Sequence, residues 1–549
     1  IFMASSNFIA GEKIIKAIIK KGFFNPSFLA TLKRQVLKNS NRKRILTNVE
    51  LLSVYHKLLQ QKRIKKNQAL EKLLKRRKIR TLSGVAPVTV LTKPFPCPGR
   101  CLFCPKEPEM PKSYLKNEPA ANRAWMNNFN PYQQVFVRLK ALQENGHKTD
   151  KIELIVLGGT WSAYPQKYQY WFIKECFRAA NDFPLSKDQS SPHSLPSKIK
   201  TSKIKKQLTQ EKQKNEKAKN RIIGLTLETR PDCINLKEIK RMRELGCTRV
   251  ELGVQSVFDY ILKINHRGHT VNQTIAATQL LKDAGFKINY HIMLNLPGSN
   301  PTFDFKIFKT LFTDERFQPD LLKIYPCVVL KTAPLYWLWK KGSYKPYSEK
   351  TLINLLLKIK KIIPPYVRIQ RIIRDIPKQN IVAGSQISNL RQLIEESGKK
   401  QCRCIRCREI REPEKIKDKI KLFRCNYLAS GGQEIFLSFE SPDQKKLYAL
   451  LRLRLPAKNP TKNKTLPILK NAALIRELHT YGELVPINQK DKQKAQHQGL
   501  GRQLMLKAEE IVKKETSYKK IAVIAGVGVR EYYRKLDYKL EGEYMIKNI

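Results

Sequence analysis

Short apolar runs alternate with longer stretches of helical periodicity from about residue 85 to residue 374, and this alternation limits the possible folds more than any other feature. The apolar runs include residues 152–157, 249–254 and 287–294, and helical patterns such as 273–284 lie between them. Such runs are typical of repeated βα units, whose strands form a parallel sheet covered by helices. The sequence therefore predicts an α/β fold in which this region forms a partial (βα) barrel.

The chain of 549 residues is too long for a single core, since an ordinary domain holds roughly 100–200 residues. Residues 1–80 are basic, and Leu51, Leu52, Tyr55 and Leu58 recur at helical spacing, which predicts a helical arm that faces RNA. We expect the barrel over residues 81–395, a cysteine-bearing connector over 396–425 and a separate C-terminal domain over 426–549.

Residues 186–220 interrupt the βα pattern. They are rich in Ser, Lys and Gln and contain few large apolar side chains. A segment of this composition has little apolar surface to bury, so it is predicted to be a disordered insertion between two βα units.

Three cysteines, Cys97, Cys101 and Cys104, follow the strand-like run 88–91 and are separated by three and then two residues. The run places them on a loop at the carboxyl end of a strand, where barrel enzymes carry their chemistry. Three thiolates at this spacing can bind three irons of a 4Fe–4S cluster and leave the fourth iron open. A structural zinc site is the alternative, but none of the eight histidines lies nearby in sequence to supply a fourth ligand.

Two glycine-containing segments have positions that suit ligand binding. Residues 158–160, Gly-Gly-Thr, end the strand-like run 152–157, where backbone amides can approach a cofactor. Residues 499–501, Gly-Leu-Gly, precede the helical run 502–513, and a loop that opens a helix presents unpaired amides and a positive dipole end to a pyrophosphate. Strand-like runs at 473–478 and 520–525 and a short helix at 529–538 surround this second loop.

The cysteine spacing resembles the signature of the radical SAM superfamily, and residues 496–501, with the pattern Q-x-x-G-x-G, resemble the acetyl-coenzyme A loop of the GNAT acetyltransferases. Further segments that carry a resemblance are 228–232 (ETRPD), 251–256 (ELGVQS), 265–270 (NHRGHT) and 526–535 (GVGVREYYRK). Together they make nearly the whole chain similar to the catalytic subunit of Elongator and its stand-alone bacterial and archaeal relatives, the tRNA uridine-34 carboxymethyl synthases.

This resemblance implies an enzyme that modifies the wobble uridine of tRNA with S-adenosylmethionine and acetyl-coenzyme A. A 5′-deoxyadenosyl radical would take a hydrogen atom from the acetyl methyl group, and the carbon radical would add at C5 of the uracil. Hydrolysis of the thioester would leave 5-carboxymethyluridine. A radical is required because no side-chain base near neutral pH removes a proton from this unactivated methyl group.

The resemblance also assigns residues. Lys151 is informative, because it lies in the barrel region and a contact with coenzyme A from there would bring the two modules together. The cluster ligands implied are Cys97, Cys101 and Cys104, with Gly158, Gly159 and Thr160 beside S-adenosylmethionine. The acetyl-coenzyme A contacts implied are Lys151, Arg476, Glu477, Leu478, His479, Gly499, Leu500, Gly501 and the catalytic Tyr533.

A second triplet, Cys402, Cys404 and Cys407, has the spacing of a metal knuckle. In the bacterial and archaeal branch of the family the equivalent region resembles a zinc site. Cys425 and a distant histidine are both candidates for the fourth ligand, and the sequence does not choose between them. We expect a structural zinc ion, which would close loops at the domain junction.

The formal charge is +60, from 106 basic and 46 acidic residues, which favours binding to a polyanion. A Lys-, Ile- and Asn-rich composition typical of an AT-rich genome accounts for part of that excess. With the resemblance, the expected partners are the anticodon stem-loop of tRNA and an external electron donor, with a homo-oligomer or Elongator-like subunits as further possibilities. No apolar run reaches the roughly 18 residues of a membrane span, so we expect no membrane partner and a cytoplasmic location.

Two other functions remain open at this point. The GNAT-like half alone is compatible with a protein lysine acetyltransferase whose cluster domain is vestigial. A tRNA-binding scaffold without chemistry is the second alternative, although the three cluster cysteines and the glycine loop are intact.

Overall fold

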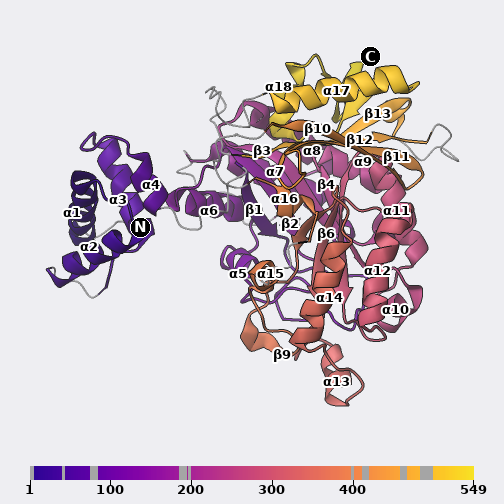
Figure 1. Ribbon diagram of the computed structural model, residues 1–549, viewed down its shortest axis with the longest axis horizontal. Helices are drawn as coiled ribbons and strands as arrows, with labels where there is room; N and C mark the ends of the chain where they lie inside the picture. The colour runs from indigo at the N-terminus through magenta and orange to yellow at the C-terminus, as the bar shows by residue number, and fades with distance from the viewer. Residues whose placement is uncertain are drawn as a thin grey trace.

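The computed structural model describes residues 5–39, 44–74, 84–184, 195, 199–396, 401–410, 419–457, 466–482 and 499–549. Figure 1 shows a small helical bundle that stands apart from a larger body, in which helices surround a central sheet and a second sheet follows. Among the described residues, no helix combines the length and the apolar character needed to cross a bilayer.

The N-terminal region is helical, and its helices pack together as a bundle. Its helices are α1 (Ser5–Lys21), α2 (Pro26–Lys38), α3 (Asn48–Gln60) and α4 (Gln68–Leu74). Thr47 and Glu50 form a capping box that fixes the start of α3. Ile15 and Tyr55 are fully buried in a core that belongs to the bundle alone. The basic residues 75–78 lie outside the described part of the chain.

The central body is the predicted partial barrel. Its seven strands are all parallel and lie in the order β1-β2-β3-β4-β5-β6-β8, with helices on the outside (Figure 1). The strands are β1 (Ala86–Leu91), β2 (Lys151–Leu157), β3 (Arg221–Thr229), β4 (Arg249–Gln255), β5 (Lys287–Leu294), β6 (Leu321–Pro326) and β8 (Arg368–Arg371); β7 (Val329–Leu330) and β9 (Ile381–Ala383) form a separate antiparallel pair. The helices are α5 (Pro119–Met126), α6 (Pro131–Glu144), α7 (Gln166–Asp182), α8 (Thr201–Lys217), α9 (Leu236–Glu244), α10 (Asp259–Ile264), α11 (Val271–Asp283), α12 (Pro301–Thr313), α13 (Leu335–Lys340), α14 (Glu349–Lys361), α15 (Leu390–Glu396) and α16 (Ile405–Arg408).

The strands bury apolar side chains toward the helices and polar side chains toward the inside of the barrel. In β5, for example, Ile288, Tyr290 and Ile292 belong to the core under the helices, so Lys287 and Asn289 point the other way. The same period of two applies to β2, β4 and β6, whose alternate apolar residues lie in that same core, whereas β3 has an irregularity after Ile222. The inside of this barrel is therefore charged, whereas barrel interiors are usually filled with branched apolar residues.

The prediction of disorder over 186–220 is wrong for the part that the structure describes. Residues 201–217 form α8, which packs against α7 and the start of β3. Ile204 and Leu208, four residues apart, are buried on one face of the helix and anchor it. The polar composition predicts disorder because the remaining anchoring side chains of α8 are charged rather than apolar. In the structure, Lys212 and Glu216 form buried ion pairs with the C-terminal domain.

The C-terminal domain is a seven-stranded mixed sheet in the order β10-β11-β12-β13-β14-β16-β15. Its first strand begins at Lys421, slightly before the predicted boundary at 426. The strands are β10 (Lys421–Ala429), β11 (Gly432–Glu440), β12 (Leu447–Leu455), β13 (Ala472–Thr480), β14 (Lys520–Val523), β15 (Lys539–Glu541) and β16 (Tyr544–Asn548), with helices α17 (Leu500–Glu515) and α18 (Arg530–Arg534). A partial barrel followed by a mixed α/β sheet confirms the predicted fold class.

The second sheet is covered on both faces. On one face, α17 packs over a core that includes Ile475, Leu504 and Ile521. On the other face, Leu474 and Ala522 join the core of the barrel domain. The C-terminal domain thus lies against the amino-terminal ends of the barrel strands, which Figure 1 shows as α17 and α18 at the opposite end from α13 and β9.

Loss of the α8 contact should loosen this arrangement. The Glu216 carboxylate accepts from Arg530 at 3.1 Å and from Arg534 at 2.7 Å, with Glu216 and Arg530 both nearly buried. Glu216→Ala should lower the free energy of unfolding by about 3 kcal/mol, the low end for a broken buried pair, because Arg530 keeps its bond to Glu543. Urea-induced unfolding measures this loss.

Lys214→Ala on the same helix is the matched control. Its ion pair with Glu211 is exposed, so the variant should lose less than about 1 kcal/mol. An equal loss in both variants would mean that α8 does not fasten the two domains.

Candidate active site

The first cysteine triplet lies on the loop after β1, at the carboxyl end of the barrel. Cys101 is buried, and Cys97 and Cys104 are half-buried. The Cys97 thiol lies 3.5 Å from the hydroxyl of Thr160, so the loop after β2 reaches the same place. Burial raises the pKa of Cys104 to about 11, although the nearby Lys112 and Arg374 charges oppose this shift. Three free thiols from one loop thus share a mostly buried, positively charged surrounding.

Two arginines stand directly behind the thiols. Arg267 donates to the Cys101 sulfur at 3.4 Å, and Arg230 donates to the backbone carbonyl of Arg267 at 2.9 Å. Asp232 holds the Arg230 guanidinium through two bonds of 2.9 and 2.8 Å. These positive groups would offset the negative charge of thiolates bound to iron. Arg230 and Arg267 lie in the segments 228–232 and 265–270 that carry the family resemblance, but the sequence alone assigns them no role.

The Gly158–Gly159 turn requires glycine for backbone reasons. Gly158 has a φ of 131° and Gly159 a φ of 97°, a region that side chains rarely tolerate. A Cβ atom on Gly158 would also collide with Thr92, whose amide continues the pairing of β1 with β2. The two glycines therefore let this turn lie tightly against the cysteine loop.

Inside the barrel, charged side chains form a continuous network below the cysteine loop. Glu251, fully buried on β4, binds Lys323, and it is 2.8 Å from Nε2 of His291. Burial alone would raise the pKa of Glu251, but the Lys323 charge and the His291 bond hold it well below its usual range. Nδ1 of His291 is 3.6 Å from Glu228, which accepts from Tyr114 at 2.9 Å. The sequence carries a signal for this network: charged residues alternate with apolar ones in strands that are otherwise apolar.

The second sheet has an opening between β13 and β14. The two strands pair in parallel only from Ala472 to Ile475, and β14 ends at Val523 while β13 continues to Thr480. The register between β12 and β13 shifts at Arg476, so one extra residue bends β13 at the point where the pairing stops. The unpaired part of β13, the amino end of α17 and α18 thus surround a wedge in the sheet.

Most of the predicted coenzyme A residues lie around this wedge, although not all offer their side chains. Gly499 caps α17 with a φ of 73°, a conformation that suits glycine, and α17 itself begins at Leu500. The Tyr532 hydroxyl lies close to Gly501, and Tyr533 is buried beside it. The Arg476 side chain is bound to Asp320 and Glu434, so only its backbone is free for a ligand. Residues 496–498 of the loop lie outside the described residues.

Glu477 and His479 lie on the part of β13 that extends past β14, on the side of the barrel. Glu477 binds Arg452 at 2.8 Å and Lys287 at 3.4 Å; burial alone would raise its pKa, but these two cations lower it to about 2. Burial lowers the pKa of His479 to about 4. Lys151 begins β2 at the same end of the barrel, and burial also lowers its pKa. These residues therefore lie at the junction of the two domains.

Comparison with known proteins identifies the family. A model described as the radical SAM superfamily matches residues 96–302, and the Radical_SAM C-terminal domain matches residues 319–400. The chain is 45% identical to the tRNA uridine(34) acetyltransferase of Methanocaldococcus infernus, over 87% of this chain and 88% of that protein. It is 38% identical to human Elongator complex protein 3, over 86% of each chain. The chain therefore belongs to the radical SAM family that includes the tRNA uridine(34) acetyltransferases and Elongator complex protein 3.

A solved structure agrees with this family assignment. The Methanocaldococcus infernus Elp3 structure with residues 1–46 deleted has a TM-score of 0.70 and 43% identity to this chain, and covers 85% of this chain and 100% of that one. The family resemblance predicted from the sequence is thus confirmed.

Membership of the radical SAM superfamily implies a 4Fe–4S cluster and S-adenosylmethionine, and the first cysteine triplet fits this requirement. Thiolates from Cys97, Cys101 and Cys104 can each bind one iron. Their sulfurs are not gathered within 4.8 Å of one another, unlike those of the second triplet in the described chain. That wider spacing suits a cluster of several irons better than a single ion.

The second triplet fits a single metal ion. The sulfurs of Cys402, Cys404 and Cys407 all lie within 4.8 Å of one another, as a tetrahedral zinc site requires. Cys425 is not part of that group, so it is not placed as the fourth ligand. The amide of Ile405 donates to the carbonyl of Val367 at 2.9 Å, which ties the triplet to the strand β8.

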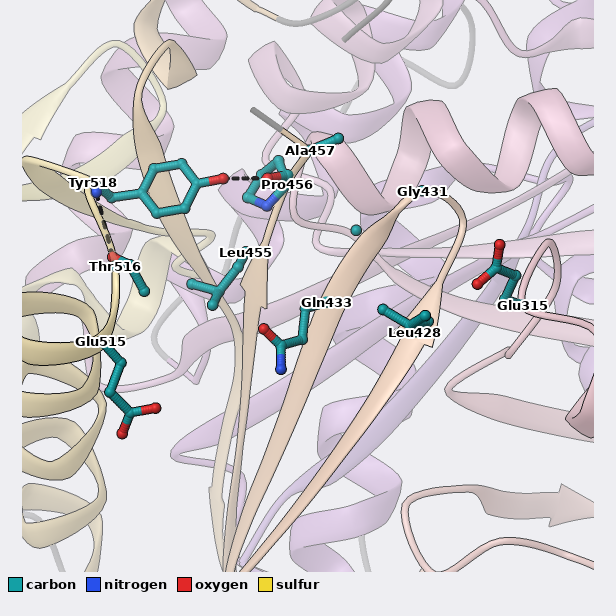
Figure 2. A pocket seen from close by; sticks show the side chains of 11 residues that line it. Glu315, Leu428, Gly431, Gln433, Leu455, Pro456, Ala457, Glu515, Thr516 and Tyr518 are labelled. Atoms are coloured by element: carbon teal, nitrogen blue, oxygen red, sulfur yellow. Dashed lines mark hydrogen bonds between the residues drawn. The ribbon is translucent and has the colours of Figure 1, made fainter. Parts of the chain in front are cut away.

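A surface hollow of about 340 Å³ lies elsewhere, mostly in the C-terminal domain, with Glu315 of the barrel domain at its edge. Figure 2 shows that the hairpin between β10 and β11, the end of β12 and the segment after α17 line it, with Leu428, Gln433 and Tyr518 among the lining residues. It adjoins the carboxyl end of α17, a helix about 24 Å long, whereas the wedge adjoins the amino end. The hollow is therefore separate from both predicted centres.

His479 should make the domain junction sensitive to acid. Its pKa is lowered from 6.5 to about 4 in the folded chain, by burial first and then by the Arg368 and Lys287 charges, against the opposing effect of Glu477 and Glu409. The unfolded chain therefore binds a proton first, and stability present above pH 6.5 is lost as the pH falls toward 4. The free energy of unfolding, measured from pH 7 to 4, should fall less steeply for His479→Asn than for the wild-type protein. Identical slopes would contradict a neutral, buried His479.

Proposed function

We propose that this protein forms 5-carboxymethyluridine at the wobble position of tRNA, with acetyl-coenzyme A as the source of the two added carbons. The Methanocaldococcus infernus relative is a tRNA uridine(34) acetyltransferase, and its match extends over 87% of this chain. The observation that carries the proposal is that a cysteine loop and an opened mixed sheet lie at the two ends of one barrel.

On the cysteine side, Cys97, Cys101 and Cys104 would hold the 4Fe–4S cluster. With S-adenosylmethionine bound, the cluster supplies a 5′-deoxyadenosyl radical, after reduction by an external donor. Arg230 and Arg267 would neutralise the thiolate charge, and the Gly158–Gly159 turn, with Thr160, would leave room for the cofactor beside the loop.

On the sheet side, the residues around the wedge would bind acetyl-coenzyme A. The amides of Gly499, Leu500 and Gly501 begin α17, where the helix dipole favours a pyrophosphate. The unpaired part of β13, including Leu478, can donate and accept backbone bonds along the pantetheine arm. Burial raises the pKa of Tyr533 well above its usual value, so its hydroxyl stays protonated and can donate to the thiol sulfur.

The charge of +60 supports tRNA as the acceptor. The helical bundle of residues 5–74 adds exposed lysines to one side of the molecule, which would contact RNA phosphates. A lysine acetyltransferase is less compatible, because it would need neither the cysteine loop nor the barrel. A scaffold without chemistry would not account for the three free thiols of Cys97, Cys101 and Cys104 on one loop.

We further propose that the chain divides functionally as its sequence predicts. The bundle would bind tRNA, the barrel would carry the radical chemistry, and the segment 396–425 would hold zinc through Cys402, Cys404 and Cys407. Arg408 supports a structural role for that segment, because it bonds Glu440 of β11 at 2.5 Å and the carbonyl of Pro365 at 2.7 Å.

Loss of one cluster ligand should abolish the modification. In cells that depend on this protein, Cys101→Ala should remove 5-carboxymethyluridine from wobble nucleosides, as measured by mass spectrometry of digested tRNA. The same variant, purified anaerobically and reduced, should form no 5′-deoxyadenosine. Cys425→Ala, outside both triplets, is the control and should keep the product.

Unchanged 5-carboxymethyluridine with Cys101→Ala would refute the proposal. Transfer of acetyl groups to lysine peptides, together with acetyl-coenzyme A turnover that tRNA does not affect, would favour the acetyltransferase alternative instead.

A further inference from the structure

The cysteine loop is held between two surface helices. Leu102 lies between two of the cluster cysteines, and its amide donates to the carbonyl of Asn265, at the end of α10, at 3.2 Å. Its carbonyl accepts from the amide of Leu335, the first residue of α13, at 2.8 Å. The loop that would carry the cluster is therefore one backbone hydrogen bond away from each helix.

A small apolar core joins these helices to the loop. Ile261 of α10 and Leu335 of α13 are fully buried in it, and Phe103 of the cysteine loop packs against it. Tyr336 packs against the same core, and its ring centre lies 5.4 Å from that of Trp337. Side-chain contacts thus run from the surface at Trp337 inward to the core that Phe103 contacts.

The outer sides of this region expose large apolar side chains. Trp337 is 59% exposed, and Tyr260 and Ile264 of α10 and Phe303 of α12 are exposed as well. We call these four residues the rim patch. Figure 1 shows α10 and α13 at the end of the body opposite the C-terminal domain. Several exposed apolar side chains around one site are typical of an interaction surface.

Lysines border the rim patch. Residues 331–350 contain five lysines and one glutamate, and all six are exposed. Lys263 of α10 and Lys306 of α12 are exposed too, with Asp259 as the acidic residue near them. The excess of positive charge favours an acidic partner.

A protein fits the rim patch better than RNA does. Ile264 has no flat face on which a base could stack. The Tyr260 and Phe303 rings pack edge to face against each other at 5.8 Å, and the Lys340 ammonium lies over the Trp337 ring at 5.5 Å. Sites for unpaired RNA instead present free aromatic faces. An exposed Trp with a charged border is typical of the centre of a protein–protein interface.

We propose that a small acidic one-electron carrier, an iron–sulfur or flavin protein, docks on the rim patch to reduce the cluster. The inference rests on the proposed function, which requires an electron from outside. One electron leaves the carrier, which is oxidised, and reduces the cluster; no bond or proton changes in this step. Such a contact can be small, because redox partners generally bury less than about 1,200 Å². The packed side chains between Trp337 and Phe103 connect the docked carrier with the cysteine loop.

The rate of cluster reduction tests the docking site. Stopped-flow absorbance follows reduction of the holoprotein by two probes, an acidic ferredoxin and an acidic flavodoxin. Trp337→Ala should lower the second-order rate constant at least about tenfold, because the contact at the centre of the interface is lost. Dithionite needs no docking surface and should reduce the variant as fast as the wild type.

Phe23→Ala is the matched control. Phe23 lies between α1 and α2 and is 59% exposed, like Trp337, so its loss should leave reduction by the carrier unchanged. An unchanged rate for Trp337→Ala would overturn the proposal, as would failure of both carriers to reduce the wild-type cluster.

Cross-linking locates the contact without use of the cluster. A carbodiimide joins carboxylates of the bound carrier to lysines of the apoprotein as amides, and the peptides are mapped by mass spectrometry. Lys340, Lys341 and Lys345 should dominate, with a yield that falls as salt screens the charges. Cross-links confined to the helical bundle of residues 5–74 would place the carrier elsewhere and refute the docking site.

Measurements with tRNA separate the remaining outcomes. If Trp337→Ala weakened tRNA binding but kept the full rate of reduction by the carrier, the rim patch would face RNA and the proposal would fail. The proposed function is tested with dithionite as the only reductant. If the wild type then formed no 5-carboxymethyluridine, that function would fail, whereas reduction by the carrier would still report on the docking site.

Discussion

The arrangement of the whole molecule depends on a buried ionic network between the barrel and the second sheet. Arg476 of β13 binds Asp320 at the start of β6 at 3.0 Å and Glu434 of β11 at 2.9 Å, and all three are buried. Burial alone would raise the pKa of Asp320, but Arg476 and Lys282 hold it well below its usual range. Taking these charges out of water is costly, and only the exact pairing across the two domains compensates. A displaced interface would leave them unpaired, so the network fixes one relative position.

Several other contacts also depend on this fixed position of the second sheet against the barrel. The bulge at Arg476 turns both Arg476 and Glu477 toward the barrel, so the residue that opens the wedge also fastens the domain. Helix α8 adds a second fastening through Glu216 and Lys212. Gly526 and Gly528 allow the chain after β14 to lie against β3 without side chains between them. The segment 526–535 (GVGVREYYRK) therefore has a packing role at the interface between the two domains.

The charged barrel interior follows from the alternation of apolar and charged residues along the strands. It is unusual, because barrel interiors are usually filled with apolar side chains. Interior carboxylates such as Glu251 and Glu228 stay paired with Lys323, His291 or Tyr114, which keeps them from acting as free bases. Buried polar atoms without a hydrogen-bond partner in the described residues occur at both ends of the barrel, for example on Arg249 near the C-terminal domain and on His269 near Arg267.

The sequence by itself determined the barrel, the cysteine loop, the glycine turn and the family, because each depends on local periodicity or on residues close together in the chain. It failed at α8, whose stability comes from partners such as Glu543 and Arg530, far away in sequence. It gave no role to Arg267 for the same reason. Arg267 meets Cys101, 166 residues earlier in the chain, and only the tertiary structure decided which of the distant charges were paired.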